Sequence, residues 1–105
     1  MKVKIPREIE LLTHKYQISF NPKEMASTGC AGLTRHLYQK IYLDKTVTPP
    51  SELNQVLFHE ILHVIERQFC VTIADADIDR LSQGLIAILT DCFGIELSWE
   101  DIEEE

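Results

Sequence analysis

One segment of the sequence, residues 51–69, is apolar around most of its circumference when it is placed on a helical wheel. At 100° per residue, Leu57 and Ile61 share one side of such a helix, and His59 and His63 lie roughly opposite. A helix with so much apolar surface has to be covered on several sides by the rest of a small protein. The sequence therefore predicts a central helix over this segment, with its two histidines facing a cleft.

The two histidines belong to the pattern His59-Glu60-Ile61-Leu62-His63. Residues four apart stack one turn above each other on a helix, so two imidazoles can hold one zinc ion. Glu60 would then lie within reach of a zinc-bound water, take its proton, and pass that proton to the leaving amine of a peptide bond. The alternative is a pair of histidines satisfied by ordinary hydrogen bonds. The motif favours a zinc site with Glu60 as general base.

A third zinc ligand has to come from another part of the chain. A second amphipathic helix is predicted over residues 75–92, and its start carries Asp75, Asp77 and Asp79. We expect Asp75 to be the ligand, with Asp79 and then Asp77 as alternatives, because one aspartate can bind zinc while another orients an imidazole. Alternatively, all three carboxylates only complement the helix dipole.

The expected fold class is α+β. Short runs rich in Ile, Val, Tyr and Phe predict strands at residues 2–5, 9–12, 15–20 and 37–43. The stretch between the last two, with Gly29 and Gly32, is predicted to be a loop. The second helix is predicted to bury an inner stripe, with Gly84 allowing close helix contact; the stripe comprises Ile78, Leu81, Leu85, Ile88 and Leu89. We expect one domain over residues 1–105, in which a mainly antiparallel sheet of three or four strands from residues 1–48 packs against both helices.

Composition limits the partners and the compartment. The 105 residues carry a formal net charge of −7, which opposes binding to nucleic acid or to an anionic membrane surface. No segment has the length of a membrane span, and the N-terminus lacks the apolar run of a signal peptide. Cys30, Cys70 and Cys92 are widely spaced and odd in number, which predicts buried free thiols in a reducing compartment. We expect a soluble cytoplasmic protein.

The layout resembles the gluzincin class of zinc metallopeptidases, in which a small sheet precedes a His-Glu-x-x-His helix and a second helix contributes an acidic ligand. More closely, it is similar to the small phage and prophage proteins of the ImmA/IrrE-like group. The likeness is carried by residues 2–6, 57–63 and 75–85. It implies a minimal zincin-like domain, a Zn²⁺ cofactor and a protein or peptide substrate. Members usually carry Glu as third ligand, whereas the second helix here begins with Asp only.

Peptide hydrolysis also needs a donor for the oxyanion and a surface for the substrate. The candidate donors are His36, Tyr38, Tyr42 and Arg80. In zincin-like proteins an edge strand above the active helix holds the substrate extended, and residues 38–43 are the candidate edge. The alternative interpretation is that the tyrosines pack on the sheet and that Arg80 is solvated. Glu66 is interpreted as a surface carboxylate, and Trp99 as a packing residue that anchors the C-terminal tail.

Three functions compete on this evidence. The leading hypothesis is a hydrolase, a zinc metallopeptidase that cleaves a cytoplasmic protein target. The second is a non-catalytic zincin-like binding module with a structural or degenerate metal site, supported by the small size and the aspartate-only choice of third ligand. The third is a metal-free helix–sheet adaptor whose acidic tail, Glu103-Glu104-Glu105, meets a basic partner.

Overall fold

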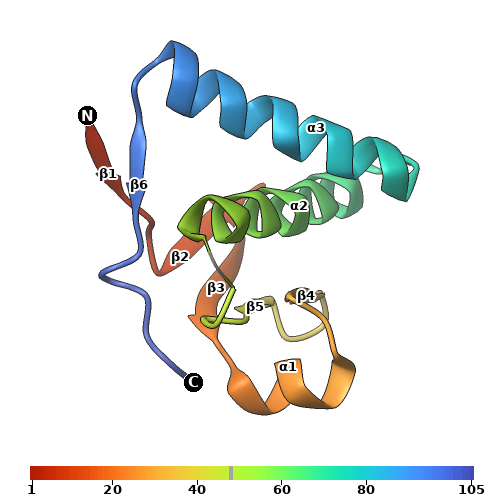
Figure 1. Ribbon diagram of the computed structural model, residues 1–105. Coiled ribbons are helices and arrows are strands. Elements are labelled where there is room, and N and C mark those ends of the chain that lie inside the picture. Colours follow the sequence, from red (N-terminus) through yellow and green to blue (C-terminus); the bar gives the residue numbers. More distant parts are fainter. Residues whose placement is uncertain (48) are drawn as a thin grey trace.

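A computed structural model describes residues 1–47 and 49–105. The order of elements is β1 (Lys2–Lys4), β2 (Glu8–Leu11), β3 (His14–Phe20), α1 (Pro22–Thr28), β4 (Gly32–Arg35), β5 (Lys40–Leu43), α2 (Pro50–Phe69), α3 (Asp75–Ala87), a π-helical turn η1 (Ile88–Cys92) and β6 (Glu96–Ser98). Helix α2 lies between the larger sheet and α3 (Figure 1). The expected α+β class is confirmed, and so is the central place of α2.

The larger sheet has four strands and two of its three pairs are antiparallel, so the expectation of a mainly antiparallel sheet of three or four strands is confirmed for it. The larger sheet has the order β2-β3-β5-β4, with antiparallel pairs at both ends and a parallel pair, β3 with β5, in the middle. Strand β1 does not join this sheet. It pairs in parallel with β6 from the other end of the chain (Figure 1). Antiparallel neighbours need only a short turn, whereas β3 and β5 are joined through α1 and β4, which allows them to run in the same direction.

The stretch that was predicted as a loop forms α1 and β4. Asn21 caps α1 by accepting a hydrogen bond at 3.1 Å from the Glu24 amide, and Gly29 ends the helix with a φ of 70°. Strand β4 then pairs with β5. The candidate edge at residues 38–43 is also wrong, because β5 lies inside the sheet and β4 forms its edge.

The main core lies between one face of the larger sheet and α2. Ile41 and Leu43 of β5 are fully buried there, and they pack with Leu53 and Leu57 of α2. Trp99 lies against Phe20 and donates its indole N–H to Asn54 at 2.7 Å. The core therefore fixes α2 against the sheet, and Trp99 packs against that core close to the C-terminal tail, as expected.

Helix α3 is packed much less completely than its sequence suggests. Of the predicted inner stripe only Ile78 is buried, while Leu81, Leu85 and Ile88 are 39–48% exposed. A Cβ added at Gly84 would meet nothing within 4 Å, so the expected close helix contact there is absent. The reason is that α3 packs chiefly on α2, and a single neighbour covers only a narrow stripe of a helix.

Two further expectations concern the thiols and the membrane. The three cysteines are free, as predicted, but all are exposed, because each lies at or just beyond the end of a helix and not on a packed face. Within the described ranges, no helix combines the length and the apolar character that crossing a bilayer requires.

Candidate metal centre

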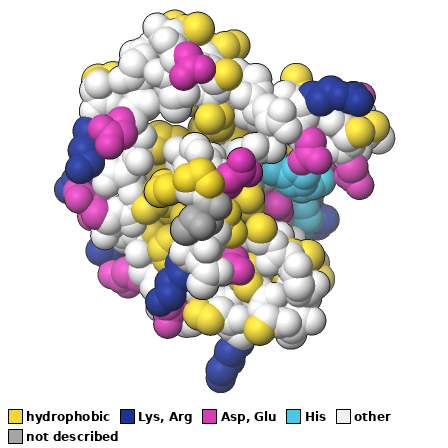
Figure 2. Space-filling view, viewed as in Figure 1, with side chains coloured by type: hydrophobic (Ala, Val, Ile, Leu, Met, Phe, Trp, Pro, Cys, Tyr) yellow, Lys and Arg dark blue, Asp and Glu magenta, His cyan; other side chains and the backbone are white. Residues whose placement is uncertain are grey.

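The two histidines of the motif converge. His59 and His63 lie one turn apart on α2, and their Nε2 atoms are 3.1 Å from each other. Both side chains are about three-quarters buried, at 25% and 28% exposure, so they are sheltered but reachable from solvent. Figure 2 shows a cyan patch of histidine side chains on this face of the molecule, with acidic side chains beside it. The helical spacing has therefore brought two ring nitrogens to one point, as the motif predicts.

A carboxylate contacts the Nδ1 atom of each imidazole, on the side of the ring away from the converging Nε2 atoms. Asp79 of α3 lies 2.7 Å from His59 Nδ1, and Glu66 of α2 lies 2.9 Å from His63 Nδ1. A carboxylate accepts hydrogen bonds, so both Nδ1 atoms are assigned as the protonated nitrogens. In neutral rings this leaves the lone pair on both Nε2 atoms. This is the arrangement by which carboxylates orient metal-binding histidines in proteins.

The lone pairs on the two neighbouring Nε2 atoms can bind a cation. Two bare Nε2 atoms at 3.1 Å repel each other unless a proton or a metal ion lies between them. Two nitrogens bound to one tetrahedral zinc ion are separated by about 3.4 Å, which is close to the observed spacing. His59 and His63 therefore fit zinc as two of its ligands.

Glu66 is the functional candidate that the sequence interpretation missed. It is 18% exposed and not a free surface carboxylate: one oxygen meets His63, and the other accepts the Ile73 amide at 2.8 Å. The Ile73 amide, followed by the His63 ring, lowers the pKa of Glu66 below its usual value. The spacing of three residues from His63 was the available signal, because such pairs are neighbours on a helix. Glu66 thus orients an imidazole and also ties the end of α2 to the segment before α3.

Glu60 lies under the edge strand. It is only 7% exposed, and the Thr34 hydroxyl of β4 donates to its Oε1 at 2.8 Å. Among the described residues, Oε2 has no hydrogen-bond partner. The close approach depends on Gly32, since a Cβ there would lie 2.5 Å from Val56 Cγ1 and 3.2 Å from Glu60 Cγ. The structure therefore places a largely buried carboxylate beside the histidines, with Thr34 on one oxygen and the other oxygen open to solvent.

The three aspartates of α3 occupy different positions. Asp79 meets His59, Asp77 forms an ion pair with Arg80 at 2.9 Å, and Asp75 is exposed one turn before Asp79. In residues 1–47 and 49–105, no group of three His, Cys, Asp or Glu side chains has the arrangement of a complete metal site. Asp79 therefore takes the orienting position, and Asp75 as third ligand stays a prediction.

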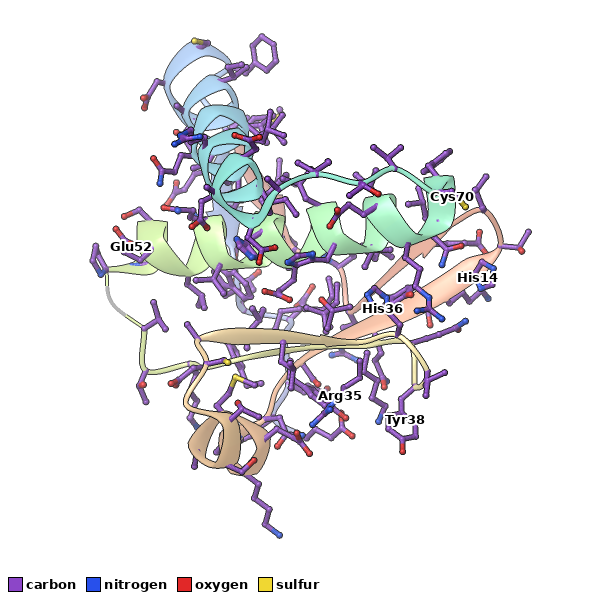
Figure 3. The ribbon with its side chains drawn as sticks, turned by 90° about the vertical axis from the view of Figure 1, so that its right-hand side faces the viewer. His14, Arg35, His36, Tyr38, Glu52 and Cys70 are labelled. Carbon is purple, nitrogen blue, oxygen red and sulfur yellow. The ribbon has the colours of Figure 1, made fainter. Side chains whose placement is uncertain are left out.

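His36 is the one candidate oxyanion donor that lies close to the histidine pair. It follows the edge strand β4 and sits in the space between the sheet and α2 (Figure 3). Its Nδ1 is 3.0 Å from the hydroxyl of buried Tyr16, and with that hydroxyl as donor the His36 Nε2 carries the proton. Burial, and then the nearby charges of Arg67 and His63, lower the pKa of His36. A neutral His36 can thus donate a hydrogen bond.

The other three candidate oxyanion donors do not lie beside His59 and His63. Tyr38 is 72% exposed in the turn after β4 and points away from α2 (Figure 3). Tyr42 alternates with the core residues Ile41 and Leu43, so it lies on the opposite face of the sheet, where its hydroxyl donates to Glu105. Arg80 pairs with Asp77 of its own helix.

A cavity opens beside Glu60 and the first histidine. It runs along α2 towards the start of the helix, and its other wall is the segment leading into β4. Its volume is about 330 Å³. It is lined by Cys30, Ala31, Gly32, Glu52, Gln55, Val56, His59, Glu60 and Asp79. A ligand in this cavity would touch the candidate general base directly.

Comparison of the chain with protein-family models, with curated proteins and with solved structures finds no match. The functional assignment therefore rests on the residues of the chain and their geometry.

Proposed function

We propose that this protein is a zinc-dependent peptidase with a minimal zincin-like domain, related to the ImmA/IrrE-like group. The observation that carries the proposal is the convergence of His59 and His63, whose Nε2 atoms are 3.1 Å apart while a carboxylate holds each Nδ1. A pair of histidines that served only packing would need no such double support. The buried carboxylate of Glu60 beside them supplies the second element of the chemistry.

In this proposal His59, His63 and Asp75 hold zinc, which when bound acidifies water and polarises a peptide carbonyl. Asp79 and Glu66 keep the two imidazoles in the tautomer that presents Nε2. Glu60 takes a proton from the attacking water at its solvent-open Oε2 and returns it to the nitrogen of the leaving amine. Thr34 fixes the orientation of this carboxylate by donating to Oε1.

The edge strand β4 is suited to hold the substrate. Its outer side is the open edge of the larger sheet, so an extended peptide can add to it through backbone hydrogen bonds. Because Gly32 lets β4 lie directly over Val56 and Glu60, such a peptide would pass close to the histidines. His36, just after β4, is positioned to donate to the oxyanion that forms when water attacks the carbonyl. Exposed free thiols favour a reducing compartment such as the cytoplasm.

The test combines metal analysis with one conservative substitution. Purified protein supplied with zinc is expected to bind about one ion per chain and to cleave peptides from a digested bacterial proteome. Glu60→Gln should keep the zinc and lose activity by roughly 100-fold or more, the usual contribution of a general base. Glu8→Gln on the exposed β2 strand is the control for the loss of one charge. Failure to bind zinc after its addition, or full cleavage by Glu60→Gln, would contradict the proposal.

One observation favours the second candidate, a non-catalytic zincin-like module. No three-ligand group is in place within the described ranges, and Asp75 is exposed. A module of this kind would bind zinc, if at all, as a structural ion, and it would recognise its partner through β4. Zinc binding with no cleavage by the wild-type protein, together with unchanged partner binding in Glu60→Gln, would decide for it.

A further inference from the structure

His36 differs from the two motif histidines in the kind of group that contacts its Nδ1 atom. The groups that contact Nδ1 of His59 and His63 are carboxylates, and an ionised carboxylate can only accept a hydrogen bond. The group that contacts Nδ1 of His36 is the hydroxyl of Tyr16, at 3.0 Å, and a hydroxyl can donate as well as accept. The three rings can therefore carry their protons on different nitrogens.

The burial of Tyr16 decides the direction of this hydrogen bond. Tyr16 is 1% exposed in the core, and among the described residues its hydroxyl has no partner except His36. If His36 carried its proton on Nδ1, the hydroxyl would have to accept, and its own hydrogen would be left without an acceptor in a buried place, which costs free energy. With the hydroxyl as donor, both groups are satisfied. Burial thus assigns the proton of a neutral His36 to Nε2.

The same contact orients the His36 ring. The two rings meet edge to face, with centroids 6.0 Å apart and an interplanar angle of 82°. His36 follows β4 and sits between the sheet and α2 (Figure 3). Because Nδ1 is bound to Tyr16, the protonated Nε2 is the nitrogen left for a ligand, and no described residue bonds it. A protonated ring nitrogen donates to oxygen and has no lone pair for a metal ion.

We propose that Tyr16 is a positioning residue, which keeps His36 as a hydrogen-bond donor to the substrate carbonyl and excludes it from the zinc ligands. The inference rests on the proposed peptidase function and goes beyond it, because it gives a role to a core residue of β3 that touches neither zinc nor peptide. His59 and His63 present lone pairs to a cation, whereas His36 presents an N–H to an oxygen. The partner of each Nδ1 atom makes this difference.

The first test reads the protonation of His36 by ¹⁵N NMR of the metal-free protein, at a pH where the ring is neutral. Nε2 is expected to carry the proton. The Nδ1 resonance should shift in Tyr16→Phe, which removes the hydroxyl and keeps the ring. Added zinc should shift the Nε2 resonances of His59 and His63 and leave the proton on Nε2 of His36.

Three results of this NMR test would overturn the inference, whether or not the protein cleaves peptides. They are a proton on Nδ1 of His36 in the wild-type protein, an Nδ1 resonance that is unchanged in Tyr16→Phe, and loss of the Nε2 proton when zinc is added. The last result would make His36 a zinc ligand and leave the proposed peptidase function in place.

The second test is kinetic. Tyr16→Phe is expected to lower kcat by about tenfold with little change in KM, a fraction of the roughly 100-fold loss expected when His36→Ala removes the donor itself. In the His36→Ala background Tyr16→Phe should have no further effect, because the hydroxyl acts through that ring. Tyr42→Phe removes a buried hydroxyl on the opposite face of the sheet and should keep the wild-type kcat. Losses that add in the double variant would show a merely structural role and overturn the inference.

Discussion

Two acidic regions of this protein have different hydrogen-bond and ion-pair partners. In the C-terminal tail, Glu103, Glu104 and Glu105 form ion pairs with Arg7, Lys45 and Lys40. At the candidate metal centre, Glu60, Glu66 and Asp79 contact a hydroxyl, a backbone amide and two imidazoles, and none of them pairs with a lysine or arginine among the described residues.

The difference separates carboxylates that stabilise the fold through ion pairs from carboxylates that, in the proposed function, orient a metal site. The ion pairs of the tail hold residues 103–105 against the larger sheet. Backbone hydrogen bonds of Phe20 with Glu103 and Glu105 add to this attachment. The carboxylates of the candidate centre instead accept hydrogen bonds from two imidazoles, a hydroxyl and a backbone amide. We therefore expect substitutions in the two regions to have different effects on zinc affinity and on stability.

The largest difference should appear in zinc affinity. Glu66→Gln and Asp79→Asn each remove the charge that orients one imidazole, and zinc binding is expected to weaken by roughly 10–100-fold. Competition with a chromophoric chelator measures it. Glu104→Gln makes the same charge change in the tail and should leave zinc affinity unchanged. Equal losses in all three variants would show that net charge, and not the geometry of the centre, controls binding.

Adding one methyl group at Gly32 is expected to disturb the packing of β4 over Glu60. Gly32→Ala places a Cβ 2.5 Å from Val56 Cγ1, and valine on a helix has little freedom to move, so β4 has to shift away. We expect a loss of about 1–3 kcal/mol in the free energy of unfolding, measured with urea. Gly84→Ala, with open space around it on α3, should instead stabilise by about 0.5–1 kcal/mol. A neutral Gly32→Ala would contradict the tight packing of β4 on α2.

A substitution in the tail should have the smallest effect on the free energy of unfolding, and this effect should depend on pH. The Lys40 ammonium, followed by the Ser19 and Tyr42 hydroxyls, lowers the pKa of Glu105 below its usual value. A lowered folded-state pKa means that this contribution to stability is present above the unfolded value of about 4.3 and is lost as pH falls through the folded value. Glu105→Gln should therefore be less stable than wild type near pH 7 and equal to it at low pH. Urea unfolding at several pH values measures this, and a constant difference across the range would contradict it.

Local patterns predicted the elements better than their partners. The period of Leu57 and Ile61 indicated α2, and the start of the second helix at Asp75 is as predicted. The place of β1 beside β6 depends on contacts between the two ends of the chain, which no local pattern contains. The apolar residues Leu81 and Leu85 have a helical period but no covering layer, so periodicity alone overestimated their burial.

In the candidate site, too, local spacing predicted some residues, while others depend on tertiary contacts. His59 and His63 were identified by their spacing, because the helix repeat alone places them on one face. Thr34 and Gly32 were not, since their contact with Glu60 exists only once β4 lies against α2. Tyr16 was missed for the same reason: its hydroxyl meets His36 across strands that are 20 residues apart in the chain.

The sequence by itself determined the helix that carries the metal motif, because the period and spacing of residues 51–69 are properties of a single element. Only the tertiary structure decided which carboxylates hold the imidazoles and which strand lies over Glu60. These depend on distances between segments that are remote in the chain, and those distances are set by how the whole core packs.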